Sequence, residues 1–207
     1  MGLLKKVFVQ TRKPEGVLGK MMISGMNKGH AKVADWGLSH LKTIAPSEIL
    51  EVGCGGGRNA RALMQKYPSA KMTAIDYSDT SLATARAYNA DMIKNGRCEI
   101  KHGDVSALDL ESDKYDLATA FETIYFWPGL EKCFSNVARV LKPGGTFMIV
   151  NESDGTDKAA SYYENMIEGM KCHKKEDIID ALKSAGFSSV KADVHDSKPW
   201  ITVVAKK

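Results

Sequence analysis

Seven short apolar runs recur along this 207-residue chain, and they constrain its fold more than any other feature. The runs are Glu48–Val52, Lys71–Asp76, Glu99–His102, Leu117–Phe121, Thr146–Val150, Val190–Val194 and Trp200–Ala205. Helical patterns lie between most of them, at Asn59–Tyr67, Ser78–Asn95, Leu130–Leu141 and Lys174–Ala185. Strands that alternate with helices predict a doubly wound α/β fold, in which helices cover both faces of a mostly parallel sheet.

The residues at the ends of these segments support the same fold. Ser78 belongs to the residue types that cap helix N-termini, and Gly186 follows Ala185 where a glycine commonly ends a helix. Pro143 is expected to end the helix before the fifth run, because proline cannot continue a helix. Only four residues, 196–199, separate the last two runs, which predicts an antiparallel hairpin at the C-terminus.

The first 45 residues fall outside this alternation. Ala31–Leu41 has a helical pattern, and an apolar, flexible patch is expected before it, formed by Met21, Met22, Ile23 and Met26. We expect residues 1–45 to form a helical cover over the ligand-binding edge of the sheet, within the same domain as residues 46–207. Gly155–Cys172 is expected to form a second cover.

The composition bounds the class of protein. Hydrophobic residues make up 43% and charged residues 26% of the chain, which suits a folded domain and excludes a disordered one. No apolar run approaches the ~18 residues that span a bilayer, and the N-terminus lacks the pattern of a signal peptide, so a cytoplasmic location is expected. The four cysteines, at 54, 98, 133 and 172, form no Cys-x-x-Cys pair, so we expect reduced thiols.

The net charge of +4 leaves two interpretations open. Basic residues gather near both ends of the chain, at Lys5, Lys6, Arg12 and Lys13 and at Lys206 and Lys207. Solvated tails are the commoner explanation of such clusters, and a nucleic-acid or membrane-surface footprint is the alternative. The oligomeric state is left open.

A glycine-rich turn after the first run carries the best functional signal. Residues 49–59 read Ile-Leu-Glu-Val-Gly-Cys-Gly-Gly-Gly-Arg-Asn, a buried strand, a turn and the start of a helix. In open α/β sheets ligands bind beyond the carboxyl ends of the strands, where glycines admit close approach and a helix N-terminus offers free N–H groups. The dinucleotide fingerprint G-x-G-x-x-G/A is not met, because Arg58 occupies its last position counted from Gly53.

Two acidic residues follow the next two runs. Asp76 ends the second run, where a carboxylate can accept hydrogen bonds from both hydroxyls of a ribose. Asp104 follows the third run and can accept from an adenine amino group, while Val105 can pack on the ring. The alternative is that both aspartates only cap turns, as this residue often does.

Together with Tyr115–Glu122 and Leu141–Gly145, these segments resemble the class I S-adenosylmethionine-dependent methyltransferases. The resemblance is closest to the small-molecule group called type 11 or ubiquinone-biosynthesis-like, and it spans Ile49–Val150, half of the chain. It implies a Rossmann-like, seven-stranded, mostly parallel sheet with an antiparallel C-terminal hairpin strand. It also implies S-adenosylmethionine as the cofactor and S-adenosylhomocysteine as the product.

The resemblance implies a role for each matching position. Gly53, Gly55 and Gly57 would line the methionine part of the cofactor, with Cys54 as a small filler of the turn. Glu51 would orient the turn or reach the cofactor's amino group through water. Asp76 would bind the ribose, Tyr77 would flank the adenine, and Asp104 and Val105 would hold it. Glu122 and Thr123 would border the sulfonium, close to the acceptor.

The reaction itself needs few catalytic side chains. Methyl transfer from a sulfonium is an in-line displacement that mainly requires acceptor and methyl at near-attack distance in a dry pocket. A base is needed only if the acceptor must lose a proton, and the candidates are His30, Glu122 and Tyr125. The alternatives are that His30 hydrogen-bonds backbone at a helix start and that Tyr125 packs on the helix beneath. Tyr162, Tyr163, Met166 and Met170 complete an apolar pocket or, alternatively, belong to the core.

The kind of acceptor is narrowed by what is missing. Residues 121–125, Phe-Glu-Thr-Ile-Tyr, lack the Asn/Asp-Pro-Pro-Tyr/Phe loop of base-flipping amino-methyltransferases. The acidic cluster of magnesium-dependent catechol-type enzymes is not evident. We therefore expect a metal-independent enzyme for a small, partly apolar acceptor, with O-, N-, S- and C-methylation all open. The alternatives are a non-catalytic cofactor-binding partner protein and an RNA methyltransferase, for which nucleic-acid binding is favoured only by the basic ends.

Overall fold

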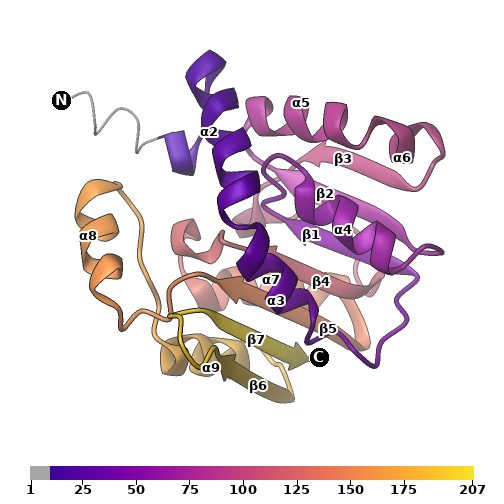
Figure 1. Ribbon diagram of the computed structural model, residues 1–207. Coiled ribbons are helices and arrows are strands. Elements are labelled where there is room, and N and C mark those ends of the chain that lie inside the picture. The colour runs from indigo at the N-terminus through magenta and orange to yellow at the C-terminus, as the bar shows by residue number, and fades with distance from the viewer. Residues whose placement is uncertain (1–9) are drawn as a thin grey trace.

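The computed structural model describes residues 10–207, and their strands form one sheet of seven in the order β3-β2-β1-β4-β5-β7-β6 (Figure 1). The strands are β1 Glu48–Val52, β2 Lys71–Asp76, β3 Cys98–His102, β4 Tyr115–Phe121, β5 Leu141–Asn151, β6 Ser189–Val194 and β7 Ile201–Lys206. The first five pair in parallel, and β7 runs antiparallel to both β5 and β6. The predicted doubly wound sheet with a C-terminal hairpin is confirmed.

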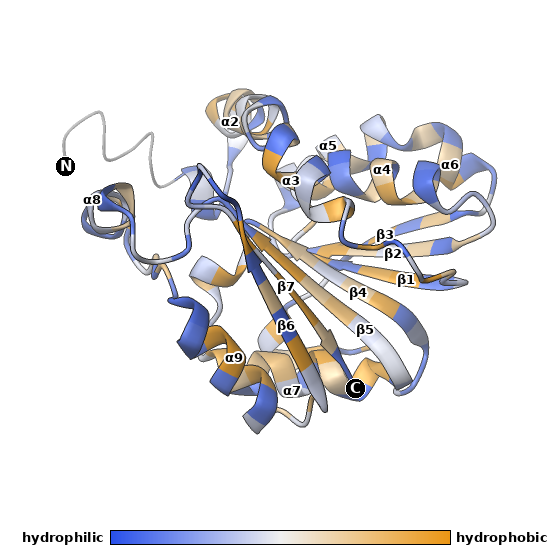
Figure 2. Ribbon diagram, turned by 60° about the horizontal axis from the view of Figure 1, so that its bottom comes forward, coloured by the Kyte–Doolittle hydropathy of each residue, from blue (hydrophilic) through white to orange (hydrophobic). Residues whose placement is uncertain are grey.

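Helices cover both faces of this sheet (Figure 2). They are α2 Gly16–Gly29, α3 Ala31–Leu38, α4 Arg58–Lys66, α5 Asp79–Tyr88, α6 Ala90–Lys94, α7 Leu130–Val140, α8 Lys158–Met166 and α9 Lys175–Ser184, with short 3-10 turns η1 Val105–Ala107 and η2 Ile124–Phe126. One core cluster joins the sheet to α3, α4 and α5, and the other joins it to α7 and α9. Strand β4 contributes Leu117 to the first cluster and Ala118 to the second, as a strand buried on both faces must.

The chain reverses its direction of winding between β1 and β4. From β1 it proceeds outward through β2 to β3, and it then returns to β4 on the other side of β1 before reaching β5. In a doubly wound sheet the carboxyl ends of the strands at this reversal form the ligand crevice. The glycine-rich turn follows β1 and therefore lies at this crevice.

Two helix-end predictions are confirmed and one helix is interrupted. The Ser78 hydroxyl accepts a hydrogen bond from the Ser81 N–H at 3.3 Å, and Gly186 follows α9 with φ of +92°. The predicted single helix over Ser78–Asn95 is wrong, because the chain breaks at Asn89 into α5 and α6. The buried Asn89 amide donates to the carbonyls of Gly57 and Ala85, both at 3.0 Å, so a tertiary contact holds the break.

The helix before β5 ends slightly earlier than its sequence suggests. Helix α7 ends at Val140, and Pro143 lies within the irregular start of β5, where the pairing with β4 changes register. Leu141 is fully buried and pairs with Tyr115, so burial of this side chain starts the strand before the proline is reached. The expectation that Pro143 itself ends the helix is therefore wrong.

The N-terminal cover is more regular than predicted. The apolar patch that was expected to be flexible is helix α2, in which Ile23 is fully buried while Met21 is 68% exposed. Four glycines weaken the local helical signal of this segment, and packing against the glycine-rich turn stabilises the helix instead. The second predicted cover, Gly155–Cys172, contains the short helix α8.

All four cysteines are free thiols, in line with the expectation, and all four are buried. Within residues 10–207, no helix has the length and apolar character that crossing a membrane requires. Lys5 and Lys6, part of the basic N-terminal cluster, lie outside the described residues.

Candidate functional site

The glycine-rich turn is held tightly at the end of β1. The N–H groups of Gly53 and Cys54 both donate to the Ile75 carbonyl of β2, at 2.8 and 2.9 Å. Gly53 has φ of +77°, and a Cβ there would overlap the Thr123 side chain. Gly55 has φ of +50° and open space where a Cβ would point. The turn therefore needs glycine for its positive φ angles, and at Gly53 also for the close contact with Thr123, which follows β4.

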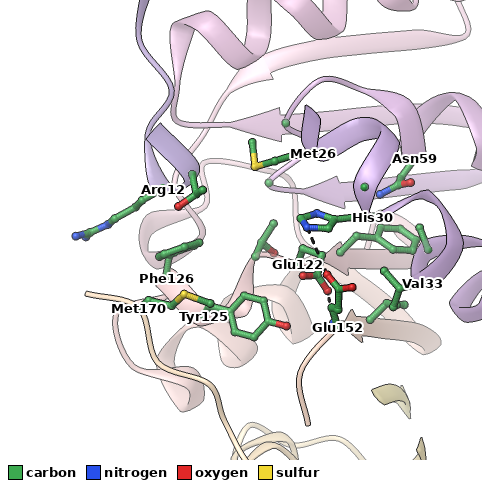
Figure 3. A pocket seen from close by; sticks show the side chains of 18 of the residues that line it. Arg12, Met26, His30, Val33, Asn59, Glu122, Tyr125, Phe126, Glu152 and Met170 are labelled. Carbon is green, nitrogen blue, oxygen red and sulfur yellow. Dashed lines mark hydrogen bonds and ion pairs between the residues drawn. The ribbon is translucent and has the colours of Figure 1, made fainter. Parts of the chain in front are cut away.

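One cavity of about 850 Å³ opens at this edge of the sheet (Figure 3). Its volume lies at the upper end of the range of about 300–1,000 Å³ that is usual for small-molecule sites. It brings together most of the predicted site residues, namely His30, Gly53, Cys54, Gly55, Asp76, Tyr77, Asp104, Val105, Glu122, Thr123 and Tyr125. Helix α2 contributes Met22 and Met26 to its wall, and the covering role of residues 1–45 stays a prediction.

Of the residues predicted to bind the cofactor, Glu51 and Gly57 do not line this cavity. Burial raises the pKa of Glu51 well above its usual value, and its Oε2 has no hydrogen-bond partner among the described residues. A Cβ on Gly57 would lie 3.0 Å from the Ala85 Cα, so packing against α5 requires this glycine. The structure thus gives Gly57 a packing reason that its motif position did not reveal.

Asp76 is buried and oriented by backbone donors. Its two carboxylate oxygens accept from the N–H groups of Gly55 and Ser78, each at 2.9 Å. Burial raises the pKa of Asp76, and these hydrogen bonds oppose the rise. A carboxylate oxygen has more than one lone pair, so both oxygens can still accept from ribose hydroxyls. Tyr77 beside it donates its hydroxyl to the Arg12 carbonyl, and burial raises the pKa of Tyr77 to about 12.

Asp104 caps a turn and also lines the cavity, so neither of its two predicted roles excludes the other. Its Oδ1 accepts from the Ser106 N–H at 2.8 Å and so caps η1, while the residue also lines the cavity. Val105 next to it is 7% exposed and lines the same wall. The cap fixes where the aspartate stands, which leaves its other oxygen for a ligand.

The opposite end of the cavity is acidic. Glu122 follows β4 with a left-handed backbone, φ +59°, and its carboxylate accepts from the Glu152 N–H after β5. Burial raises the pKa of Glu122 to about 8, and the neighbouring Glu152 charge adds to the rise. Hydrogen bonds from the Glu152 backbone and the Tyr125 hydroxyl oppose it. A carboxyl group with such a pKa can exchange a proton near neutral pH.

His30 lies opposite these carboxylates, at the junction of α2 and α3. Its Nε2 is 3.6 Å from the Glu152 Oε2, as the dashed line in Figure 3 marks. Burial lowers the pKa of His30 although Glu152 opposes the shift, so the neutral imidazole is favoured. The side chain makes no capping hydrogen bond to α3, contrary to the alternative of a backbone-bonding helix-start histidine. His30 thus lines the cavity beside the two carboxyl groups, and its role as a base stays a prediction.

Glu152 is the residue that sequence reasoning missed. The signal was present, because an acidic residue directly follows the fifth strand just as Glu122 follows the fourth. Ligand atoms of His30, Glu122 and Glu152 lie within 4.8 Å of one another, and this is the group among residues 10–207 that could hold a metal ion. The expectation of a metal-independent site stays a prediction.

The aromatic segment after β4 serves both the cavity and the core. Tyr125 is buried, its hydroxyl accepts from the Ser153 N–H at 3.1 Å, and it packs with Met170. Trp127 lines the cavity and also stacks on Phe147 in the core, at 6.3 Å between ring centroids. Of the other predicted pocket residues, Tyr163 and Met170 line the cavity, whereas Tyr162 and Met166 do not.

Comparison with known proteins agrees with this geometry. A family model described as a methyltransferase domain matches residues 49–145. Sterol 24-C-methyltransferase of Saccharomyces cerevisiae is 31% identical over 169 residues, which cover 73% of this chain and 43% of that protein. The enzyme of the same name from Clavispora lusitaniae is 27% identical over 177 residues, 79% of this chain and 47% of that protein. The chain thus spans about half the length of these curated relatives.

Solved structures share the fold. A putative O-methyltransferase from Nostoc punctiforme superposes with a TM-score of 0.80 at 16% identity, covering 99% of this chain and 67% of that one. Human N-acetylserotonin methyltransferase, solved with S-adenosylmethionine, has a TM-score of 0.75 at 16% identity, covering 92% and 56%. With the family model over residues 49–145 and the curated relatives, this fold identifies the chain as a class I S-adenosylmethionine-dependent methyltransferase domain. The predicted class is confirmed, and the predicted type 11 subgroup stays a prediction.

The cavity fits S-adenosylmethionine, the cofactor of this class. The open space beside Gly55 admits a ligand close to the backbone, and the Asp76 carboxylate is aimed at the same turn. The buried Oε2 of Glu51, in the strand just before the turn, has no hydrogen-bond partner among the described residues, so a bound water would satisfy it.

Proposed function

We propose that the protein transfers the methyl group of S-adenosylmethionine to a small, partly apolar acceptor bound in the same cavity. The observation that carries this proposal is the continuity of the cavity, which joins the glycine-rich turn and Asp76 to the wall formed by Tyr125 and Phe126. The volume supports room for a cofactor and a small acceptor together. The names of the curated relatives, sterol methyltransferases, also favour an acceptor with an apolar body.

The residues of the cofactor end would bind and orient. When bound, S-adenosylmethionine supplies an electrophilic methyl group on a positively charged sulfur. Asp76 would accept from the ribose hydroxyls, and Asp104 with Val105 would hold the adenine. Gly53 and Gly55 would let the backbone approach the methionine part, and Glu122 with Thr123 would border the sulfonium. These side chains contribute mainly position, which can supply most of the rate enhancement of a displacement.

The residues of the acceptor end would exclude water and hold a proton. Met22 and Met26 of α2 close the cavity from one side, and Tyr125 closes it from the other. His30 would act as the base for an acceptor that must lose a proton, and Glu122 would orient the acceptor's polar atom. Tyr125 would position Glu122 through its hydroxyl.

Calorimetric titration with S-adenosylmethionine tests the cofactor end. We expect Asp76→Ala to weaken binding at least ~10-fold, or ~1.4 kcal/mol, because the ribose loses its acceptor. Asp109→Ala is the matched control, since this exposed aspartate does not line the cavity and should bind as the unmodified protein does. Equal affinity of Asp76→Ala and the control, or preferential binding of NADH by the unmodified protein, would contradict the proposal.

A further inference from the structure

We propose that the methyl acceptor is an amine whose nitrogen binds between Glu122, Glu152 and His30, against the aromatic wall of the cavity. The inference rests on the proposed function and deepens it by naming the substrate class. Its grounds are the charge, the aromatic lining and the proton acceptor that the tertiary structure brings to this end of the cavity.

The charge at this end is negative. Glu122 and Glu152 line the cavity from the ends of β4 and β5, and Asp157 lines it from the N-terminus of α8. Among residues 10–207, neither glutamate forms an ion pair with a lysine or arginine, and the contact of Glu152 with a basic side chain is the one with His30. Ligand atoms of the two glutamates lie within 4.8 Å of each other, and repulsion by the Glu152 charge helps to keep Glu122 protonated. A bound ammonium group would offset this repulsion and would favour ionisation of both carboxyl groups.

Two of the basic side chains of the lining are engaged elsewhere, and a third is exposed. Arg58 pairs with Asp35 at 2.5 Å, and Arg12 donates to the Glu168 carbonyl at 3.3 Å. Lys198 belongs to the turn between β6 and β7 and is exposed. The burial of His30 favours its neutral form. The cavity therefore offers an anionic acceptor end, which disfavours carboxylate or phosphate groups at the reacting atom.

The aromatic lining fits the same ligand. Tyr125, Phe126, Tyr163 and Trp200 contribute rings to the cavity wall. Aromatic faces attract ammonium groups, and they attract methylated ammonium groups in particular because these shed water easily. Carboxylates and aromatic rings together recognise the methylated product as well as the substrate.

The chemical step balances with the groups present. The bound ammonium gives one proton to Nε2 of His30, and the resulting imidazolium pairs with Glu152. The freed lone pair on nitrogen forms a bond to the methyl carbon while the carbon–sulfur bond breaks and its electrons stay on sulfur. The positive charge thus moves from sulfur to nitrogen, and Glu122 lies beside both positions in the proposed arrangement. The sulfur of the product S-adenosylhomocysteine is an uncharged thioether.

A matched pair of probes tests the assignment by binding rather than turnover. Phenethylamine and 2-phenylethanol share the same phenylethyl group. The first carries a cationic amine where the second carries a neutral hydroxyl group. Each is titrated by calorimetry into the full chain saturated with S-adenosylhomocysteine, in buffer with EDTA so that no divalent cation occupies the carboxylates. We expect phenethylamine to bind at least ~10-fold tighter than 2-phenylethanol. The preference should fall to about 3-fold or less in Glu152→Gln and Glu122→Gln.

Glu111→Gln is the control, because Glu111 is exposed and does not line the cavity, and its preference should match that of the unmodified protein. Glu152 is itself exposed, so its substitution leaves the core intact. Equal binding of the two probes, no binding of either, or a preference that persists in both glutamine variants would overturn the amine assignment. If S-adenosylhomocysteine did not bind the same samples, the proposed methyltransferase function itself would be contradicted, and the amine assignment would fall with it.

Discussion

Glu122 shows how a single residue can be costly to the fold and useful to the site. It adopts a left-handed backbone with φ of +59°, which is uncommon for a residue other than glycine, and it carries a carboxyl group into a partly closed cavity beside Glu152. Strained and poorly solvated residues of this kind persist where the surrounding structure holds them. Here Phe121 pairs with Val150, and this register places the acidic residues after β4 and β5 side by side.

Glu122→Gln should remove a pH-dependent destabilisation. The pKa of Glu122 is about 8 in the folded protein, above the ordinary value of 4.5, so the folded state holds this proton more tightly than the unfolded state. Its presence therefore lowers stability progressively as pH rises from about 4.5 to about 8. We expect the melting temperature of Glu122→Gln, relative to the unmodified protein without ligand, to rise across this pH range and to be flat below it. If the difference in melting temperature did not depend on pH, the pKa of Glu122 in the folded protein would have its ordinary value.

At the scale of elements, the packing of helix α2 requires a glycine in the glycine-rich turn. A Cβ on Gly56 would lie 2.6 Å from the Ile23 side chain of α2 and would also overlap Asn27. Gly56 therefore lets the N-terminal helix rest directly on the turn. The three glycines after Cys54 thus have different reasons: Gly55 leaves open space for a ligand, Gly56 admits α2, and Gly57 admits α5.

Gly56→Ala should loosen this contact between α2 and the turn. We expect a loss of about 1–3 kcal/mol of unfolding free energy from overpacking, measured by urea denaturation. Gly25→Ala within α2 is the control, because a Cβ there meets nothing within 4 Å and alanine favours the helix by about 0.5–1 kcal/mol. If Gly56→Ala were as stable as Gly25→Ala, α2 would not rest on the turn as the structure has it.

At the scale of the whole molecule, the N-terminal segment belongs to the core of the sheet. Val33, Ala34 and Leu38 of α3, with Leu41, are buried in the same cluster as Leu63 of α4. A Cβ on Gly37 would overlap Val150 of β5, so α3 packs directly on the sheet. This supports the prediction that residues 1–45 form part of one domain with residues 46–207, as far as residue 10.

Unfolding should then be a single cooperative transition. We expect the urea midpoint from far-ultraviolet circular dichroism to coincide with the midpoint for hydrogen exchange of the amides in α3, because both report loss of one shared core. The exchange of β4 amides within the same sample is the internal control. A lower midpoint for α3 alone would mean that the cover is a separately unfolding unit.

The sequence by itself determined the sheet, its hairpin, the glycine-rich turn, the aspartate that ends β2 and the aspartate that follows β3. Those features depend on local patterns, since apolar periodicity, turn residues and spacing along the chain are written in neighbouring residues. Only the tertiary structure decided that Met21–Met26 is helical, that Asn89 interrupts a helix, that Gly57 serves packing and that Glu152 joins His30 and Glu122. Each of these depends on a contact between segments distant in sequence, and a contact of that kind leaves no periodic signal in the chain.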